Sequence, residues 1–214
     1  MNLRQPPLLR RVARKGSDKA KLAEQVIAAP TLLPQIFDGL QASEAPVKYG
    51  CEKVLMLISE KAPALLYPHM DCFVGLLESG NNFLKWGAIR IIANLAVVDV
   101  ENKFEKVFDR YFAPIPGPAM ITAGNIVASA PKIAAAKPHL AERIVRELLK
   151  VEHARYQTAE CRNVALGHVI LALGQLCESL QDKTAVMALV RRQLENSRNA
   201  TRIKAGKFLR KYGV

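Results

Sequence analysis

Apolar residues between positions 70 and 95 recur at the spacing of two amphipathic helices. The first stripe is Met70, Phe73, Val74 and Leu77, and the second is Leu84, Gly87, Ile91 and Leu95. Between the stripes stand Ser79, Gly80 and Asn81, which are typical turn and cap residues. Neither helix can bury its apolar stripe alone. We therefore expect the two helices to pack on each other and then on neighbouring pairs, as in a repeat protein.

A glycine in the second helix marks each return of this pattern. It recurs at steps of 37, 37, 43 and 39 residues, as Gly50, Gly87, Gly124, Gly167 and Gly206. The residue three positions before it is always aliphatic, namely Val47, Leu84, Ile121, Val164 and Ile203. The residue four positions after it is Val54, Ile91, Ala128 and Leu171, until Arg210 breaks the pattern. Because a glycine inside a helix costs about 1 kcal/mol relative to alanine, we expect neighbouring helices to approach closely at these positions.

The two-helix period and the run LLESGNNFLKWGAIRIIANLA, residues 76–96, resemble a HEAT or armadillo repeat. The resemblance covers about residues 31–213 and implies an all-α fold, a right-handed α-α superhelix (solenoid) of about five helix pairs. A helix from Ser17 to Ala29 is expected to cap its N-terminal end. In armadillo proteins an asparagine late in the last helix of each repeat holds an extended peptide, and Asn94 stands in a similar place. The equivalent residues Leu57, Pro131 and Gly174 depart from that pattern.

Charge and length divide the chain into an arm and a body. The 214 residues are enough for one domain with a substantial core, which we place at 17–214, after a basic and flexible arm at 1–16. The net charge of +12 belongs to the ends. Residues 1–21 hold seven basic groups and one acidic group, and residues 191–214 hold eight and one. Two separate positive patches are therefore expected, suited either to solubility or to acidic partners.

No motif in the sequence points to catalysis, a cofactor or a metal. The four histidines show no i, i+4 pair, and the four cysteines show no C-x2-C spacing. Cys161 and His168 lie two helical turns apart but lack a third catalytic group, so ordinary packing explains them better. We find neither a signal peptide nor an uninterrupted apolar span for a membrane, and we expect a reducing cytoplasm.

Basic residues recur beside the marker glycines. Lys48, Lys85 and Lys204 stand two positions before a marker, and Lys53 and Arg90 stand three after one. The plain explanation is the solvated face of amphipathic helices. The functional alternative is a basic row on the concave face that second helices line in a HEAT-like stack, which would meet an acidic peptide or a polyanion.

The sequence therefore favours a non-catalytic scaffold that binds a protein or acidic peptide through its concave face. The expected contact residues are Lys48, Lys53, Lys85, Arg90 and Asn94, together with a basic C-terminal patch of Arg198, Arg202, Lys204, Lys207, Arg210 and Lys211. The alternative is a nucleic-acid-binding or DNA-repair protein, motivated by the isoelectric point near 9.7. A modifying enzyme on a HEAT scaffold rests on fold analogy alone. The sequence leaves the partner's identity and the oligomeric state open.

Overall fold

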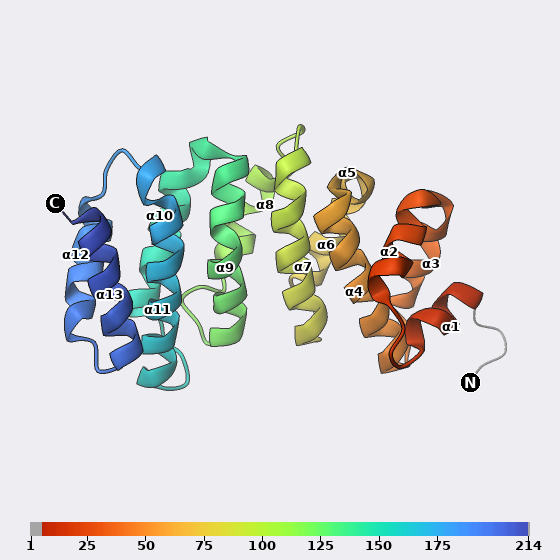
Figure 1. The fold of residues 1–214 in the computed structure, drawn as a ribbon, viewed down its shortest axis with the longest axis horizontal. Coiled ribbons are helices and arrows are strands. Elements are labelled where there is room, and N and C mark those ends of the chain that lie inside the picture. The colour runs from red at the N-terminus through yellow and green to blue at the C-terminus, as the bar shows by residue number, and fades with distance from the viewer. Residues whose placement is uncertain (1–5, 214) are drawn as a thin grey trace. The chain divides into compact units, whose positions relative to one another are not determined.

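The computed structural model describes residues 6–213, which form helices and contain no strand (Figure 1). The all-α helical-repeat fold predicted from the sequence is therefore confirmed. The helices gather in two compact units, Met1–Glu101 and Asn102–Val214, which are described below one at a time. The assignment of residues 17–214 to a single domain stays a prediction.

Unit 1 holds two N-terminal helices followed along the chain by two helix pairs. The pairs are α3 with α4 and, after the short α5, α6 with α7. Tight 3-10 turns lead into or out of these helices because prolines and short connections leave no room for longer loops. The bounds are α1 Pro7–Ala13, α2 Lys19–Ala28, η1 Pro30–Leu32, α3 Leu33–Gly39, α4 Ala45–Lys61, α5 Pro63–Leu66, η2 Tyr67–His69, α6 Met70–Leu76, α7 Asn82–Leu95 and η3 Ala96–Val98.

The segment expected to be a flexible arm contains helix α1. Leu8, Leu9 and Val12 lie on one side of this helix and are buried, and α1 packs against α4. Burying three aliphatic side chains is worth several kcal/mol, enough to fix one short helix. Residues 7–13 thus differ from the expectation, whereas residues 1–5 of the predicted arm lie outside the described residues. The cap helix α2 forms as predicted, although Asp18 rather than Ser17 accepts the backbone N–H groups at its start.

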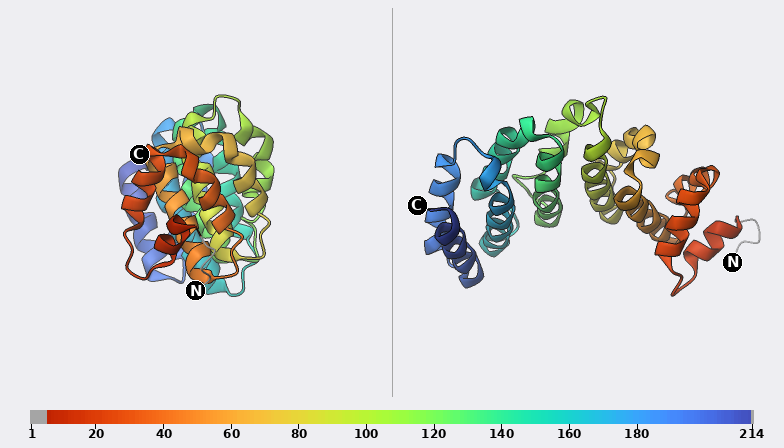
Figure 2. Two further views of the ribbon diagram at one scale, coloured as in Figure 1. Left: turned by 90° about the vertical axis from the view of Figure 1, so that its right-hand side faces the viewer. Right: turned by 45° about the horizontal axis from the view of Figure 1, so that its top comes forward.

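Unit 2 holds three helix pairs, α8 with α9, α10 with α11, and α12 with α13. The second helices run side by side, with α11 packed between α9 and α13 (Figure 2). With the two pairs of unit 1, the predicted number of about five pairs is confirmed. The bounds are α8 Lys103–Phe112, α9 Met120–Ala136, η4 Pro138–Leu140, α10 Ala141–Leu149, η5 Lys150–His153, α11 Ala159–Leu176, η6 Cys177–Ser179, α12 Thr184–Arg192, η7 Gln193–Glu195 and α13 Asn199–Tyr212.

Each unit has its own core. In unit 1 the side chains of Leu55, Ile58 and Phe73 are fully buried between first and second helices. In unit 2 four aromatic rings of α8 pack edge to face in the interior, those of Phe104, Phe108, Tyr111 and Phe112. Rigid cores of this kind hold the second helices in fixed positions, so that their remaining exposed faces are preformed surfaces.

The marker glycines all lie inside second helices, but the expected close approach occurs at only three of them. A methyl group on Gly50, Gly87 or Gly167 would collide with a neighbouring helix. At Gly124 the space is open, and at Gly206 a methyl group would reach only Arg210, four residues on in the same helix. The glycine register therefore marks close helix crossings on α4, α7 and α11, and not on α9 and α13.

Candidate functional site

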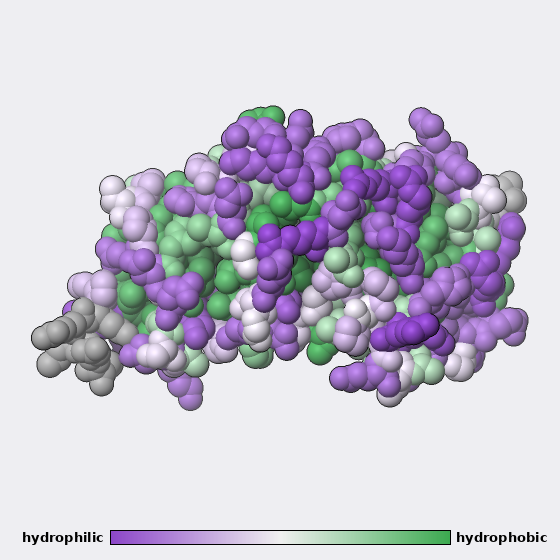
Figure 3. Space-filling model, turned by 180° about the vertical axis from the view of Figure 1, so that it is seen from behind, coloured by the Kyte–Doolittle hydropathy of each residue, from purple (hydrophilic) through white to green (hydrophobic). Residues whose placement is uncertain are grey.

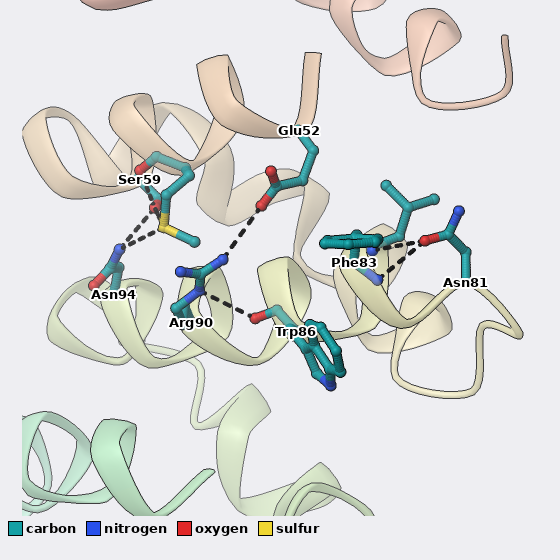
Figure 4. Close-up of polar contacts among 9 residues, drawn as sticks. Glu52, Ser59, Asn81, Phe83, Trp86, Arg90 and Asn94 are labelled. Atoms are coloured by element: carbon teal, nitrogen blue, oxygen red, sulfur yellow. Dashed lines mark hydrogen bonds and ion pairs between the residues drawn. The ribbon is translucent and has the colours of Figure 1, made fainter. Parts of the chain in front are cut away.

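Helices α4 and α7 of unit 1 carry most of the predicted contact residues. Lys53 and Arg90 are exposed, whereas Lys48 and Lys85 are half-buried along their stems. Arg90 donates through Nε to the carbonyl of Trp86, 3.3 Å away in the same helix. Its Nη2 lies 3.8 Å from Oε1 of Glu52, so Figure 4 shows the guanidinium between the Trp86 carbonyl and the Glu52 carboxylate. The positive charge of Arg90 is thus partly matched from within the unit.

Glu52 was missed by the sequence analysis, and it lies at the α4–α7 crossing. Its carboxylate occupies the space that a side chain on Gly87 would need, since a Cβ there would come within 2.2 Å of Oε1. That oxygen is buried and has no hydrogen-bond partner. Burial raises the pKa of the Glu52 carboxyl, and the nearby Arg90 and Lys53 act against the rise. The crossing therefore holds a desolvated carboxylate beside two cations.

Asn94 does not offer its amide to a partner in this structure. Its residue surface is only 7 % exposed, and Nδ2 donates to Oγ of Ser59 across the α4–α7 contact at 2.8 Å (Figure 4). Nδ2 also lies 3.9 Å from Sδ of Met56. Asn94 stands seven residues after Gly87, which places it on the same helix face as the crossing point, two turns on. In this structure Asn94 forms a hydrogen bond that joins two helices, and its role as a peptide contact stays a prediction.

Three aromatic rings gather at the N-terminal ends of α4 and α7. The rings of Tyr49 and Phe83 are 5.3 Å apart, and those of Phe83 and Trp86 are 5.5 Å apart. Asn81, which caps α7, also donates to the hydroxyl of Tyr49 at 3.1 Å. Phe83 remains 61 % exposed. Trp86 is partly exposed.

The second helices of unit 2 expose aliphatic residues that the glycine register would bury. Ile121 of α9 is 54 % exposed, and Leu171 of α11 and Ile203 of α13 are both 50 % exposed. Ile126 and Ile170, on other faces of the same helices, are buried instead. The buried face of these helices is therefore not the face that the glycine register predicts. We call Ile121, Ala128, Leu171 and Ile203 the aliphatic face of unit 2.

Two hollows open on this aliphatic face. One, of about 290 Å³, lies between α9 and α11 and is lined by Ile121, Gly124, Ala128, Val164 and His168, among others. The other, of about 550 Å³, lies between α11 and α13. We call it the α11–α13 groove. Its lining includes Leu171, Gly174, Ile203 and Phe208, with Lys204, Lys207 and Lys211 along α13.

The predicted basic C-terminal patch divides into two parts. Arg198 forms an ion pair with Glu160, and Arg202 donates to the carbonyl of Asn196 at 2.7 Å, so both hold the turn between α12 and α13. Lys204 and Lys207 line the groove and have no carboxylate partner among the described residues. Lys211 lies 3.5 Å from Glu178 and 4.6 Å from the ring centre of Tyr212. Arg210 is exposed and lies outside the groove lining.

Lys204 crosses the α11–α13 contact at Gly167. Its Nζ would be 3.2 Å from a Cβ at that glycine. Burial lowers the pKa of Lys204, and the charge of Arg198 adds to the shift. Burial also lowers the pKa of His168 on α11, with further lowering by Lys204 and Arg198. Lys204 and Arg198 thus disfavour the charged form of His168, and Arg198 disfavours the charged form of Lys204.

Exposed charge distinguishes the first helices from this region. Arg146 of α10 and Arg191 and Arg192 of α12 are exposed, and Arg192 also pairs with Glu152. Seen from behind, hydrophilic side chains cover much of the surface, with hydrophobic patches between them (Figure 3). In contrast, α9 carries one charged residue, Lys132, and α11 carries none from Asn163 to Leu176. An exposed helix face without charge is unusual, because surface helices normally turn charged residues to water.

Among residues 6–213 no three His, Cys, Asp or Glu side chains are grouped to hold a metal ion. The four cysteines are free thiols, and burial raises the pKa of Cys51 to about 12, which keeps it unreactive. Among the described residues, no hydrogen bond joins Cys161 to His168. None of the described helices combines the length and apolarity needed to cross a membrane.

Comparison with known proteins supports the fold. Over 94 % of this chain and 90 % of the other, the structure matches a designed armadillo repeat protein with a TM-score of 0.61 and 15 % identity. The chain has an armadillo-like helical-repeat fold. A second designed armadillo repeat protein, solved in complex with the peptide (KR)4, matches with a TM-score of 0.57 and 14 % identity. This second match covers 98 % of this chain and 99 % of the other. No family model and no curated protein matches the sequence.

Proposed function

We propose that this chain is a non-catalytic scaffold that binds a segment of a partner protein on the exposed face of its second helices. The observation that carries the proposal is the aliphatic face of unit 2, where Ile121, Leu171 and Ile203 are each at least half exposed. Contiguous exposed apolar surface that borders a hollow is a common mark of an interaction site. The side chains stand on helices fixed by a buried core, so a partner would meet a surface that needs little ordering.

The armadillo-like neighbour in complex with (KR)4 supports peptide binding by this fold. Its peptide consists of lysine and arginine, whereas the α11–α13 groove of unit 2 is lined by three lysines. A basic peptide would be repelled there. We therefore propose the same general use of the fold with a segment of different charge.

Unit 1 supplies a second, more polar surface. Lys48, Lys53, Lys85 and Arg90 stay proposed contact residues, and the exposed rings of Tyr49 and Phe83 lie beside them. Aromatic residues and arginine, here Tyr49, Phe83 and Arg90, are enriched at protein interfaces. If reversing the charge of both Lys48 and Lys85 leaves a captured partner bound with unchanged affinity, this surface is not a contact.

A display selection on the purified chain tests the proposal. Random peptides that bind the chain should lose binding when Leu171→Asp or Ile203→Asp is introduced on the aliphatic face. Leu194→Asp is the matched control, because Leu194 is an exposed leucine of unit 2, 41 % exposed, that lines neither hollow. The proposal fails if no peptide is enriched above background, or if the control weakens binding as much as the two face variants do.

Nucleic acid remains the competing class of partner. It is motivated by the net charge of +12 and by the basic cluster of Arg11, Arg14, Lys15 and Lys21 around the α1–α2 turn. A mobility-shift titration over salt decides the matter, since binding that releases counterions falls steeply as salt rises. Absence of a shift at low salt ends this alternative. Location in the cytoplasm stays a prediction.

A further inference from the structure

The α11–α13 groove joins an apolar floor to a basic edge. Leu171 and Ile203 form its two exposed walls, and Phe208 closes the floor with only 5 % of its surface exposed. Gly174 lines the groove without a side chain, and the nearest atom of Phe208 would be 3.7 Å from a Cβ there. At about 550 Å³ the hollow falls in the range of about 300–1,000 Å³ that is typical of ligand sites.

The basic edge follows from the spacing of lysines on α13. Lys204, Lys207 and Lys211 stand at i, i+3 and i+7, which places them in a row along one helix face. No acidic residue lines the groove. Lys211 is partly matched by Glu178, but Lys204 and Lys207 face the groove without a carboxylate partner among the described residues. The row is therefore a set of cations held beside an apolar hollow.

Lys204 lies at a position where a bound anion would be electrostatically favourable. Its ammonium group crosses α11 at Gly167, close to His168 and Arg198. Arg198 pairs with Glu160, whereas Lys204 has no carboxylate partner among the described residues. Desolvated like charges repel one another, and a carboxylate placed among them would reverse the sign of that interaction. The lysines of the groove thus favour an acidic ligand, and its apolar lining favours a ligand that also carries apolar side chains.

Resting on the proposed function, we propose that the α11–α13 groove binds an acidic segment of a partner protein that carries aliphatic side chains. An aliphatic side chain occupies the hollow over Gly174, between Leu171 and Ile203. Neighbouring aspartate or glutamate side chains of the segment pair with Lys204 and Lys207. The hydrophobic contact supplies affinity, and the lysine row selects against basic segments.

A nucleic acid fits the same groove less well. Binding of bases needs open aromatic faces for stacking. Phe208 is buried, and the ring of Tyr212 is held by its hydroxyl, which donates to the carbonyl of Gly174 at 2.7 Å. Lys211 already stands over the Tyr212 ring at 4.6 Å. The groove therefore offers phosphate contacts but no free platform for a base.

Fluorescence anisotropy with short labelled probes tests the proposal. The probes are an acidic peptide with alternating leucines, the same peptide with serine for leucine, the same peptide with lysine for each acidic residue, and oligodeoxythymidine. We expect only the acidic leucine peptide to bind strongly at physiological salt. Lys207→Glu should weaken it about tenfold or more, whereas Arg210→Glu should change it little. These two substitutions reverse one exposed charge each on α13, and only Lys207 lines the groove.

A second pair of variants tests the apolar half. Leu171→Ser should weaken binding of the acidic leucine peptide about as much as removal of its leucines does, and Leu194→Ser should leave binding unchanged. Circular dichroism of each variant should match that of the parent, since all four side chains are exposed.

The outcomes separate this inference from the proposed function. Equal binding of the acidic and lysine peptides, or equal loss in Lys207→Glu and Arg210→Glu, overturns the inference. Binding of oligodeoxythymidine alone overturns it in favour of nucleic acid. If the acidic leucine peptide does not bind while display-selected peptides still depend on Leu171, the inference is wrong and the scaffold proposal stands. If the display selection also yields nothing, both fail.

Discussion

The two units place opposite charges at closely similar helix crossings. In unit 1 the carboxylate of Glu52 on α4 lies over Gly87 of α7, and in unit 2 the ammonium of Lys204 on α13 lies over Gly167 of α11. Glu52 is accompanied by the opposite charges of Arg90 and Lys53, whereas Lys204 is accompanied by Arg198, of like charge. The first crossing is balanced from within, whereas at the second the carboxylate of Glu160 pairs with Arg198 and Lys204 has no carboxylate partner among the described residues. The difference teaches that a glycine crossing provides space, while the surrounding charges decide whether it is a structural contact or a candidate binding site.

Reversing the charge at each crossing should have opposite consequences. Glu52→Lys would place a third cation beside Arg90 and Lys53, and we expect it to lower the free energy of unfolding of unit 1 by about 3 kcal/mol, as for a buried unpaired charge. Lys204→Glu should leave unit 2 equally stable or slightly more stable. Trp86, the one tryptophan of the chain, lies in α7, so its fluorescence during urea unfolding reports on unit 1.

The circular dichroism of the helices reports on Lys204→Glu during the same urea titration. Glu52→Gln serves as the control for loss of the carboxylate without a new charge. A loss of similar size in both charge reversals would show that the crossings do not differ as described.

The pH dependence of unit 1 offers the next sharpest distinction. The folded-state pKa of Glu52 is raised above its ordinary 4.5, so its contribution to stability is fully present below about pH 4.5 and is lost as the pH rises through the raised pKa. The parent should therefore lose stability relative to Glu52→Gln between about pH 4 and pH 7. Urea midpoints of the two proteins, followed by Trp86 fluorescence, measure the difference. A difference that does not change with pH contradicts the desolvation of Glu52.

Unit 2 should respond to pH through His168 in the opposite direction. Its folded-state pKa is lowered below the ordinary 6.5, so its contribution to stability is present above about pH 6.5 and is lost as the pH falls through the lowered pKa. The parent should lose a small amount of stability relative to His168→Gln between about pH 7 and pH 5, because the ring is exposed. Thermal melts followed by circular dichroism check this. A histidine resonance that titrates above 6.5 would contradict it.

The smallest expected effect concerns the aliphatic face. Leu171→Ser should change the free energy of unfolding by less than about 0.5 kcal/mol, since half of the side chain is already in water. Leu173→Ser, two residues on and fully buried, should cost about 3 kcal/mol or more. Chemical denaturation of both variants makes the comparison. An equal loss in both would show that Leu171 belongs to the core.

The fold could be predicted from the sequence because the pattern of a helix pair depends on residues that are close together in the chain. Stripes at three- and four-residue steps, such as Met70 to Leu77, and cap residues such as Asn81 depend only on neighbours within a turn or two. The helix α1 was missed because its burial depends on α4, more than thirty residues away. Local pattern thus predicts elements, and distant contacts decide which weak elements persist.

The candidate site could be predicted only in part, since the glycine register records spacing along the chain and not helix rotation. A side chain on Gly87 would meet Glu52 of the preceding helix α4, whereas a side chain on Gly167 would meet Thr201 and Lys204 of the following helix α13. The two glycines thus face opposite neighbours. Leu171 is therefore exposed, whereas Ile91, its counterpart in α7, is buried.

Contacts between repeats were likewise beyond the sequence. The hydrogen bond from Asn94 to Ser59 and the position of Glu52 over Gly87 each join residues 35 positions apart. The signal that could have located the aliphatic face was present, because α9 and α11 are nearly free of charge on every face. A surface helix without charged positions indicates either complete burial or a binding surface.

Methyl nuclear magnetic resonance during titration with a display-selected peptide tests the central claim most directly. The resonances of Leu171 and Ile203 should shift in proportion to bound peptide, while that of Leu194 stays in place. Shifts of Leu194 without any change at Leu171 and Ile203 would contradict the claim that partners bind the aliphatic face of unit 2.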